Sequence, residues 1–306
     1  MSAVHRFRSV WGVAPGDNYS HWQQWFPTLK QQGYVGVEID ITGHTDLATI
    51  RRIADEAGLE ISVLIHTQWP SYAGPKPPGL TPQDHLNGYR AQLQAAKALR
   101  PVKINAHSGD DGWTTDQAVE FFSGTFAIDA EVGLEGRVSH ETHRNRALFT
   151  PYATAAVVKR VPKYVNRVED IALANFDSIR LTGDFSHFVV ACERLLDVGE
   201  EDKELIRTII PNVTHIHARM GTIQSSQIPE PTNPVFAEER KFFENAWKQM
   251  VQSIATRYPS DPITFVPEYG PYPYHPFGSA TDYSDVADSE GSRLQPIFEA
   301  FAKQAA

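Results

Sequence analysis

The chain has 306 residues, of which 41% are hydrophobic and 21% charged, an ordinary balance for a soluble globular protein. Its formal net charge of −9 argues against binding to nucleic acid, because contacts to the phosphate backbone need clustered lysine and arginine. Cys192 is the only cysteine, which excludes an intrachain disulfide and a cysteine-based zinc site.

Eight short apolar or β-branched runs recur along the chain and predict eight strands. They cover residues 9–14, 35–40, 61–66, 103–107, 137–141, 179–184, 213–217 and 263–268. Apolar residues at helical spacing lie between many of these runs, at residues 18–32, 46–57 and 115–131, and the second of these helices is expected to end at Gly58. A proline- and glycine-rich loop at 71–82 leads to a further helix that runs through Leu99. Strands that alternate with helices favour parallel βα units.

Eight such units in 306 residues predict an α/β protein with a closed (β/α)8 TIM-barrel fold. No glycine-rich fingerprint follows the first strand, which disfavours a Rossmann fold. We expect one domain over residues 1–306, because no linker divides the chain. Residues 221–239 form an unusually long connection, and long loops in compact domains are often lids or binding loops.

The ends of the last four strands carry ionisable residues, and TIM barrels place their active sites at such ends. Three neighbouring carboxylates repel one another unless a cation neutralises them, and a carboxylate–imidazole set suits Mn, Mg, Co or Zn. The candidate ligands, one for each strand, are Glu141, Asp184, His217 and Glu268. Each alone has a simpler explanation, such as a helix cap at Asp184, but their coincidence predicts a site for one divalent cation.

Alternation along the fifth strand places Glu141 and His143 on one side and His140 and Thr142 on the other. In the seventh strand His215 and His217 face the same side, so periodicity does not choose between them. We prefer His217 because it lies closer to the end of the strand.

These motifs resemble the xylose-isomerase-like TIM barrels, which include ketose 3-epimerases, inositol-catabolism isomerases and metal-dependent apurinic endonucleases. The resemblance follows the strand order over nearly the whole chain and rests on Glu141, Asp184-Phe-Ser-His187, His215-Ile-His217 and Glu268. It implies one divalent ion, manganese first with Mg, Co or Zn as alternatives, held by the four candidate ligands. It also implies that Glu141 and Glu268 move protons and that His187 and Arg219 bind substrate oxygens.

The chain departs from the epimerases in two places. Their Gly-Glu after the strand-seven histidine is replaced by Ala218-Arg219-Met220-Gly221, and the segment after Glu141 carries His143-Arg144. A glutamate bound to a cation has a lowered pKa, whereas a histidine starts near neutrality, so His143 is a third candidate catalytic base. Arg144 either binds an anionic group of the substrate or pairs with the surplus acids.

Two enzymatic functions follow from these residues. The leading one is an isomerase or epimerase that removes a proton next to a sugar carbonyl through a metal-stabilised enediolate, with Glu141, Glu268 or His143 as the base. The alternative begins with the same step but ends in β-elimination from a 3-oxo-glycoside, as in the catalytic subunits of C-glycoside deglycosidases, which this fold resembles. A barrel that binds sugar without metal or turnover is the non-enzymatic alternative.

The endonuclease branch ranks third. His66 and His107 match histidines that this branch uses, but no aspartate occurs between His217 and Asp261, so a three-metal cluster looks incomplete. The acidic chain also fits DNA poorly.

Weaker candidates lie around the expected pocket. His107 is a further candidate for substrate binding, and Trp69 and Trp11 could form apolar walls for a sugar ring. Glu38 either binds a hydroxyl or pairs with a nearby base, and the aromatic run after Glu268 is expected to line the pocket or to form an interface. We expect a small-molecule carbohydrate as the partner; a homo-oligomer, or a small partner subunit under the lyase alternative, is compatible with the sequence.

No apolar run approaches the length of a membrane span, and the first residues lack a secretory hydrophobic region. We therefore expect a cytoplasmic protein that binds neither membrane nor nucleic acid.

Overall fold

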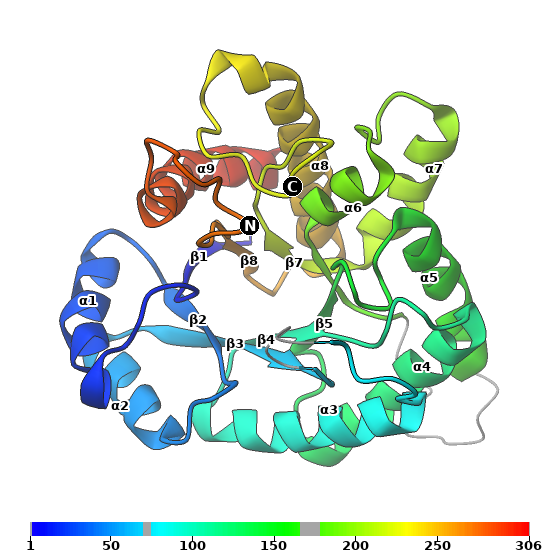
Figure 1. Ribbon diagram of the computed structural model, residues 1–306, viewed down its shortest axis with the longest axis horizontal. Helices are drawn as coiled ribbons and strands as arrows, with labels where there is room; N and C mark the ends of the chain where they lie inside the picture. The colour runs from blue at the N-terminus through cyan, green and yellow to red at the C-terminus, as the bar shows by residue number, and fades with distance from the viewer. Residues whose placement is uncertain (1, 70–74, 166–177, 306) are drawn as a thin grey trace.

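A computed structural model describes residues 2–69, 75–165 and 178–305, which form a closed barrel of parallel strands inside a ring of helices (Figure 1). The strands are β1 (Val4–Ser9), β2 (Gly36–Asp40), β3 (Glu60–His66), β4 (Lys103–His107), β5 (Val138–Glu141), β6 (Leu181–Gly183), β7 (Val213–His217) and β8 (Ile263–Val266). They follow one another in chain order, and β1 pairs with β8 to close the barrel. The predicted (β/α)8 barrel is confirmed.

The helices cover the outside of the barrel. They are α1 (Ser20–Gln31), α2 (Leu47–Ala57), α3 (Pro82–Ala96), α4 (Thr115–Val132), α5 (Pro151–Val165), α6 (Phe185–Cys192), α7 (Glu200–Ile209), α8 (Ala237–Arg257) and α9 (Tyr283–Ala305). Among the helices described, none is both long enough and apolar enough to cross a membrane. The loop predicted at 71–82 falls partly outside the described residues, which omit 70–74.

Local sequence signals set several helix ends. Thr81 caps α3 through a reciprocal pair of hydrogen bonds with Asp84, and Thr114 caps α4 in the same way with Gln117. The α2 helix ends at Gly58, whose φ of 67° lies in the left-handed region that glycine adopts without strain. These ends agree with the predicted ones to within one or two residues.

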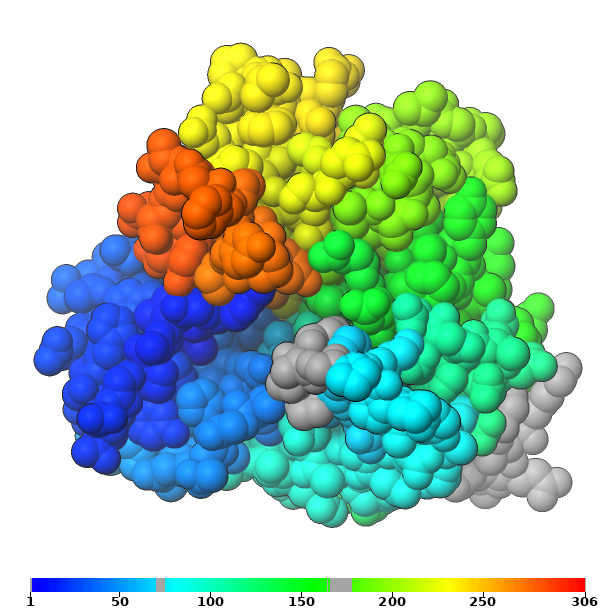
Figure 2. Space-filling model, in the orientation of Figure 1, coloured from blue at the N-terminus to red at the C-terminus, as the bar shows by residue number. Residues whose placement is uncertain are grey.

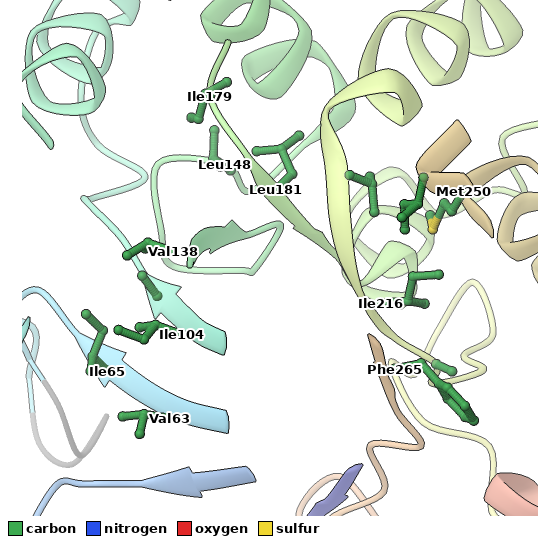
Figure 3. Close-up of a cluster of buried hydrophobic side chains, with 14 of the residues drawn as sticks. Val63, Ile65, Ile104, Val138, Leu148, Ile179, Leu181, Ile216, Met250 and Phe265 are labelled. Carbon is green, nitrogen blue, oxygen red and sulfur yellow. The ribbon is translucent and has the colours of Figure 1, made fainter. Parts of the chain in front are cut away.

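One face of each strand packs against the helices through apolar side chains (Figure 3). The strand residues in this layer include Val63, Ile65, Ile104, Val138, Leu181, Ile216 and Phe265, all fully or almost fully buried. Each such side chain contributes about 1.5–3 kcal/mol on burial. This outer layer leaves the inner face of the strands available for polar groups.

The interior of the barrel is polar to an unusual degree. Its buried side chains include Glu38, Ser62, Asn105, Ser139, Glu141, His215, His217 and Thr264. TIM barrels commonly fill this space with layers of branched apolar residues. Several of these groups bond to one another, such as Ser62 to Glu38, Asn105 to Glu141 and His215 to Thr264, and these bonds help to fix the side chains at the mouth of the barrel.

The first strand was expected at residues 9–14 but spans Val4–Ser9. Arg6 and Arg8 interrupt the apolar pattern expected of a buried strand, because alternating charged residues suggest an exposed segment. Both arginines are buried: the Arg8 Nε donates to Asp288 Oδ1 of α9 at 2.8 Å, and the Arg6 guanidinium lies 4.1 Å from the ring centroid of Tyr34. No local pattern reveals a partner 280 residues away along the chain.

The connection between β7 and α8 lies over the C-terminal end of the barrel. Its expected range, 221–239, overlaps α8, which begins at Ala237. Gln227 fixes it to the segment after β8, because its side chain donates to Gly270 O at 3.0 Å and accepts from Gly270 N at 2.9 Å. The long connection is therefore attached to the same segment that carries Glu268.

Candidate metal centre and substrate pocket

Four side chains converge at the C-terminal end of the barrel. They are Glu141 at the end of β5, Asp184 directly after β6, His217 at the end of β7, and Glu268 two residues after β8. Each offers a ligand atom, and these atoms all lie within 4.8 Å of one another. All four residues are buried. The structure thus brings together the four residues that we predicted as metal ligands.

Their donor atoms fit a divalent cation. Glu141 Oε1, His217 Nδ1 and Glu268 Oε2 are buried and have no hydrogen-bond partner among the described residues. Burying polar atoms without hydrogen bonds costs free energy, which a bound cation would recover. A set of carboxylates and one imidazole suits Mn, Mg, Co or Zn.

The electrostatics of the group favour added positive charge. Burial opposes protonation of His217, but the charges of Glu268, Glu38 and Glu141 outweigh it and raise the pKa of His217 well above its usual value. Burial also raises the pKa of Asp184 to about 6, although Arg219 counteracts it. The charges of Glu268 and Glu141 act in the same direction on both groups, because negative charge favours their protonated forms.

Arg219 supplies part of the compensating charge. Its Nη2 contacts Asp184 Oδ2, and its Nη1 lies 3.2 Å from Glu268 Oε2. The guanidinium therefore holds two of the four candidate ligands and is itself fully buried. Arg219 also lines the pocket, so it can contact a substrate.

Glu38 and Asn105 orient the group from below. Glu38 Oε1 lies 3.0 Å from His217 Nε2, while its other oxygen accepts from Ser62 Oγ at 2.8 Å. Asn105 donates to Glu141 Oε2. The sequence predicted that Glu38 either binds a hydroxyl or pairs with a nearby base, and it did not single out Asn105. The available signal for Asn105 was its position on β4, two residues before His107.

His215 belongs to a deeper layer than His217. Its Nδ1 lies 2.7 Å from Thr264 Oγ1, and its Nε2 lies 3.3 Å from Glu38 Oε2. Among the described residues, the group of Glu141, Asp184 and Glu268 includes His217 and not His215. A continuous chain of hydrogen-bonding groups thus runs from Thr264 through His215 and Glu38 to His217.

His143 lies on the same side of the chain as Glu141, as the alternation predicted. Its ring centroid is 4.4 Å from that of His107 and 3.9 Å from that of His187. His140 faces the other way, with Nδ1 2.7 Å from Ser108 Oγ and its ring against Phe122.

The contacts of His143 define its protonation. Nδ1 is 2.6 Å from Arg144 O, and a carbonyl can only accept, so Nδ1 carries the proton and Nε2 the lone pair. Burial and the nearby His107 lower the pKa of His143 well below its usual value. The ring is therefore neutral at pH 7 and able to accept a proton.

A cavity of about 810 Å³ opens beside these groups, a size that accepts a sugar or a larger glycoside. Figure 2 shows this face of the molecule, with a hollow near its centre beside the segments that follow β1 and β8. Its lining includes Trp11, Asp40, His66, His107, His143, Arg144, Arg219, Glu268, Tyr272 and Tyr274. The aromatic run after Glu268 thus contributes to the pocket wall.

The predicted substrate-binding residues divide into two groups. His107, Arg144 and Arg219 line the cavity. His187 is fully buried behind them, where its Nδ1 accepts from Arg144 Nε at 3.1 Å and its Nε2 lies 2.8 Å from Arg219 Nη2. Trp69 is not among the described residues that line the cavity; its carbonyl accepts from Arg146 Nη2 at 3.1 Å. We infer that His187 acts by positioning the two arginines.

No family model matches the chain, and no curated protein matches it in sequence. Solved structures do match over nearly its whole length. L-ribulose 3-epimerase has a TM-score of 0.58 and 13% identity, covering 99% of this chain and 97% of its own. The IOLI protein with a binding zinc atom has a TM-score of 0.58 and 11% identity, covering 97% and 99%. The probable 3-DHS dehydratase AsbF of Bacillus anthracis has a TM-score of 0.55 and 12% identity, covering 95% and 98%.

Because the sequence identities are low, these similarities establish only a shared fold. The chain shares the TIM-barrel fold of these proteins, one of which is described as a xylose isomerase-like TIM barrel, in agreement with the resemblance of its motifs. Proteins of known structure with this fold include sugar epimerases and a dehydratase, and one of them holds zinc.

Proposed function

We propose that this protein is a divalent-metal-dependent isomerase or epimerase that removes a proton next to the carbonyl of a sugar or sugar-like substrate. The convergence of Glu141, Asp184, His217 and Glu268, with three buried donor atoms that make no hydrogen bond among the described residues, beside a cavity of about 810 Å³, carries the proposal. The shared fold of a ketose 3-epimerase and of a zinc-holding protein supports it. Manganese is the ion that we expect first, with Mg, Co or Zn as alternatives.

The side chains of the pocket have distinct tasks in this proposal. A cation held by the four ligands would polarise the substrate carbonyl and stabilise negative charge on its oxygen. His143 presents the lone pair of Nε2 and accepts the proton from the carbon next to the carbonyl, with Glu141 and Glu268 as the alternative bases. Arg219 and His107 line the cavity and donate hydrogen bonds to substrate oxygens.

A lyase is the second candidate. Its first step is the same proton removal from a 3-oxo-glycoside, after which the bond to the aglycone breaks in a β-elimination. One observation favours it: His143 lies with His107 and His187 and is not one of the four candidate ligands, so it offers a base separate from them, although it also forms a second possible ligand group with His107 and Glu141. A small partner subunit would fit this alternative.

The endonuclease alternative has less support. His66 lies 3.2 Å from Asp40 Oδ2, and its ring contacts His107. Among the described residues, the three groups of ligand atoms close enough to hold a metal do not include His66. The acidic chain gives no reason to expect a nucleic-acid partner.

Isotope exchange tests the proposed function. Protein loaded with Mn²⁺ is incubated with candidate ketoses in deuterated water, and we expect deuterium at the carbon next to the carbonyl, with loss of exchange after chelation. Release of an aglycone from a 3-oxo-glycoside, without interconversion of free sugars, would select the lyase. A purified protein that takes up no divalent ion would contradict both enzymes and favour a barrel that only binds sugar.

A further inference from the structure

A second cavity, of about 510 Å³, opens at the opposite end of the barrel. Because all strands are parallel, the N-terminal ends of β4 to β8 surround it, far from the candidate metal centre. Its polar lining includes Lys103, Arg137, Arg180, Thr214 and Thr264, together with the carboxylates Glu135 and Asp261.

Lys103 is a buried amino group that forms no salt bridge among the described residues. It is the first residue of β4, is 7% exposed, and makes one hydrogen bond, from Nζ to Thr214 Oγ1 at 3.1 Å. Among the described residues no carboxylate pairs with it. A protonated lysine has three N–H donors, so two remain for a ligand. Burying its charge without a partner is costly, and an anionic ligand would remove that cost. Burial and the charge of Arg180 lower the pKa of Lys103 to about 7, although the charge of Asp261 counteracts them.

The adjacent arginines are also without acidic partners among the described residues. Arg180 Nη1 donates to Gly136 O at 2.6 Å, and its guanidinium lies 5.2 Å from the ring centroid of Tyr258. Arg137 Nη1 donates to Pro101 O at 2.6 Å. Each guanidinium has five N–H donors, so most are not used by these two bonds.

A β-bulge brings a hydroxyl group to this cavity. Leu181 pairs with Val213 but Thr182 pairs with His215, so β7 has one extra residue, Thr214. Bulges redirect side chains, and Thr214 accordingly meets Lys103 and lies 2.7 Å from Ser139 Oγ inside the barrel. The polar floor of the cavity thus depends on an irregularity of the backbone.

We propose that this N-terminal cavity binds the phosphate group of a small molecule, with Lys103 and Arg180 as its cationic contacts and Thr214 beside them. Phosphate is the group whose oxygens match several N–H and O–H donors arriving from different strands. Glu135 and Asp261 on the same wall disfavour an extended polyanion and suit a ligand that carries hydroxyl groups next to its phosphate. The proposal concerns a separate site and does not depend on the proposed function.

Calorimetric titration with inorganic phosphate, at constant ionic strength, tests the site. Each of Lys103→Met and Arg180→Gln should weaken phosphate binding about tenfold or more, the effect of losing one charge-assisted hydrogen bond. Arg180→Lys should retain part of the affinity because it keeps the charge. Two control variants should bind as the wild type does: Arg160→Gln on the exposed face of α5, and Arg144→Gln at the C-terminal mouth.

Three results would overturn the proposal: no phosphate binding by the wild type at millimolar concentration, unchanged affinity in Lys103→Met and Arg180→Gln, or loss of binding in Arg144→Gln. Thermal unfolding of each variant shows whether it folds. If Lys103→Met does not fold, the comparison between Arg180→Gln and Arg180→Lys still decides.

Discussion

Glu38 Oε1 lies 3.0 Å from Nε2 of His217, which leaves Nδ1 of the same ring directed at Glu141 and Glu268. A carboxylate that accepts from one imidazole nitrogen fixes the tautomer and presents the other nitrogen as a ligand. Glu38 is therefore a positioning residue for the candidate metal centre.

Replacing Glu38 by glutamine should lower the affinity for the divalent ion by about 10- to 100-fold, the usual effect of losing such a partner. Competition with a chelating dye measures this affinity without an assay of activity. Ser62→Ala, which removes only a hydrogen bond to the other oxygen of Glu38, is the matched control and should have a smaller effect. Equal affinities in wild type and Glu38→Gln would remove Glu38 from this role.

Glu141→Gln should lose bound metal and activity together, because it removes a charged ligand at the centre of the group. Elemental analysis of the purified variant, alongside isotope exchange, checks both effects. Glu131→Gln, which changes an exposed carboxylate on α4, should retain metal and activity. A metal-replete Glu141→Gln protein would contradict the ligand assignment.

His143→Ala should keep its metal but lose turnover by about 10²- to 10⁴-fold, the usual contribution of general-base catalysis. Metal content and isotope exchange are measured on the same preparation. His21→Ala, which changes an exposed histidine on α1, is the control and should keep both metal and turnover. Turnover retained in His143→Ala would assign the proton transfer to Glu141 or Glu268 instead.

Asp129 on α4 should make stability depend on pH. Burial raises its pKa to about 7, although Tyr89, which donates to Asp129 Oδ1 at 2.5 Å, lowers it. In the unfolded chain the pKa is about 3.9, so between pH ~4 and 7 the folded state binds more protons and its stability falls as pH rises. This cost remains above pH 7.

Asp129→Asn removes that cost while it keeps an acceptor for Tyr89. Relative to wild type, the free energy of unfolding of the variant should rise by about 2 kcal/mol between pH 5 and pH 8. Urea unfolding at the two pH values measures the difference. The exposed Asp116→Asn should show no such change, and a difference between Asp129→Asn and wild type that is independent of pH would contradict the assignment.

Alternation and strand order were sufficient to predict the barrel and the convergence of the four candidate ligands. The strands β4 and β7 match their predicted ranges to the residue, because each is a short run with a clear boundary. The eighth strand ends at Val266, two residues before its expected end, since Pro267 has no N–H to continue the ladder.

The residues behind the site could not be predicted in the same way. Glu38, Asn105 and Thr264 gain their roles only from contacts across the barrel, between strands separated by up to 177 residues in the chain. His187 matched a known motif, yet the structure places it behind Arg144 and Arg219 and not at the cavity wall. A linear pattern shows which strand end a residue occupies, but not what lies between it and the substrate.

The chain of groups from Thr264 through His215 and Glu38 to His217 has a consequence for protein engineering. A designer who transplants only the four candidate ligands onto another barrel would leave His217 unsupported. The graft must also carry the three residues beneath it, none of which belongs to the ligand group itself. In this scaffold the smallest transferable unit is therefore the ligand group together with this series of bonded residues through the barrel interior. The series ends at Thr264, which lines the second cavity.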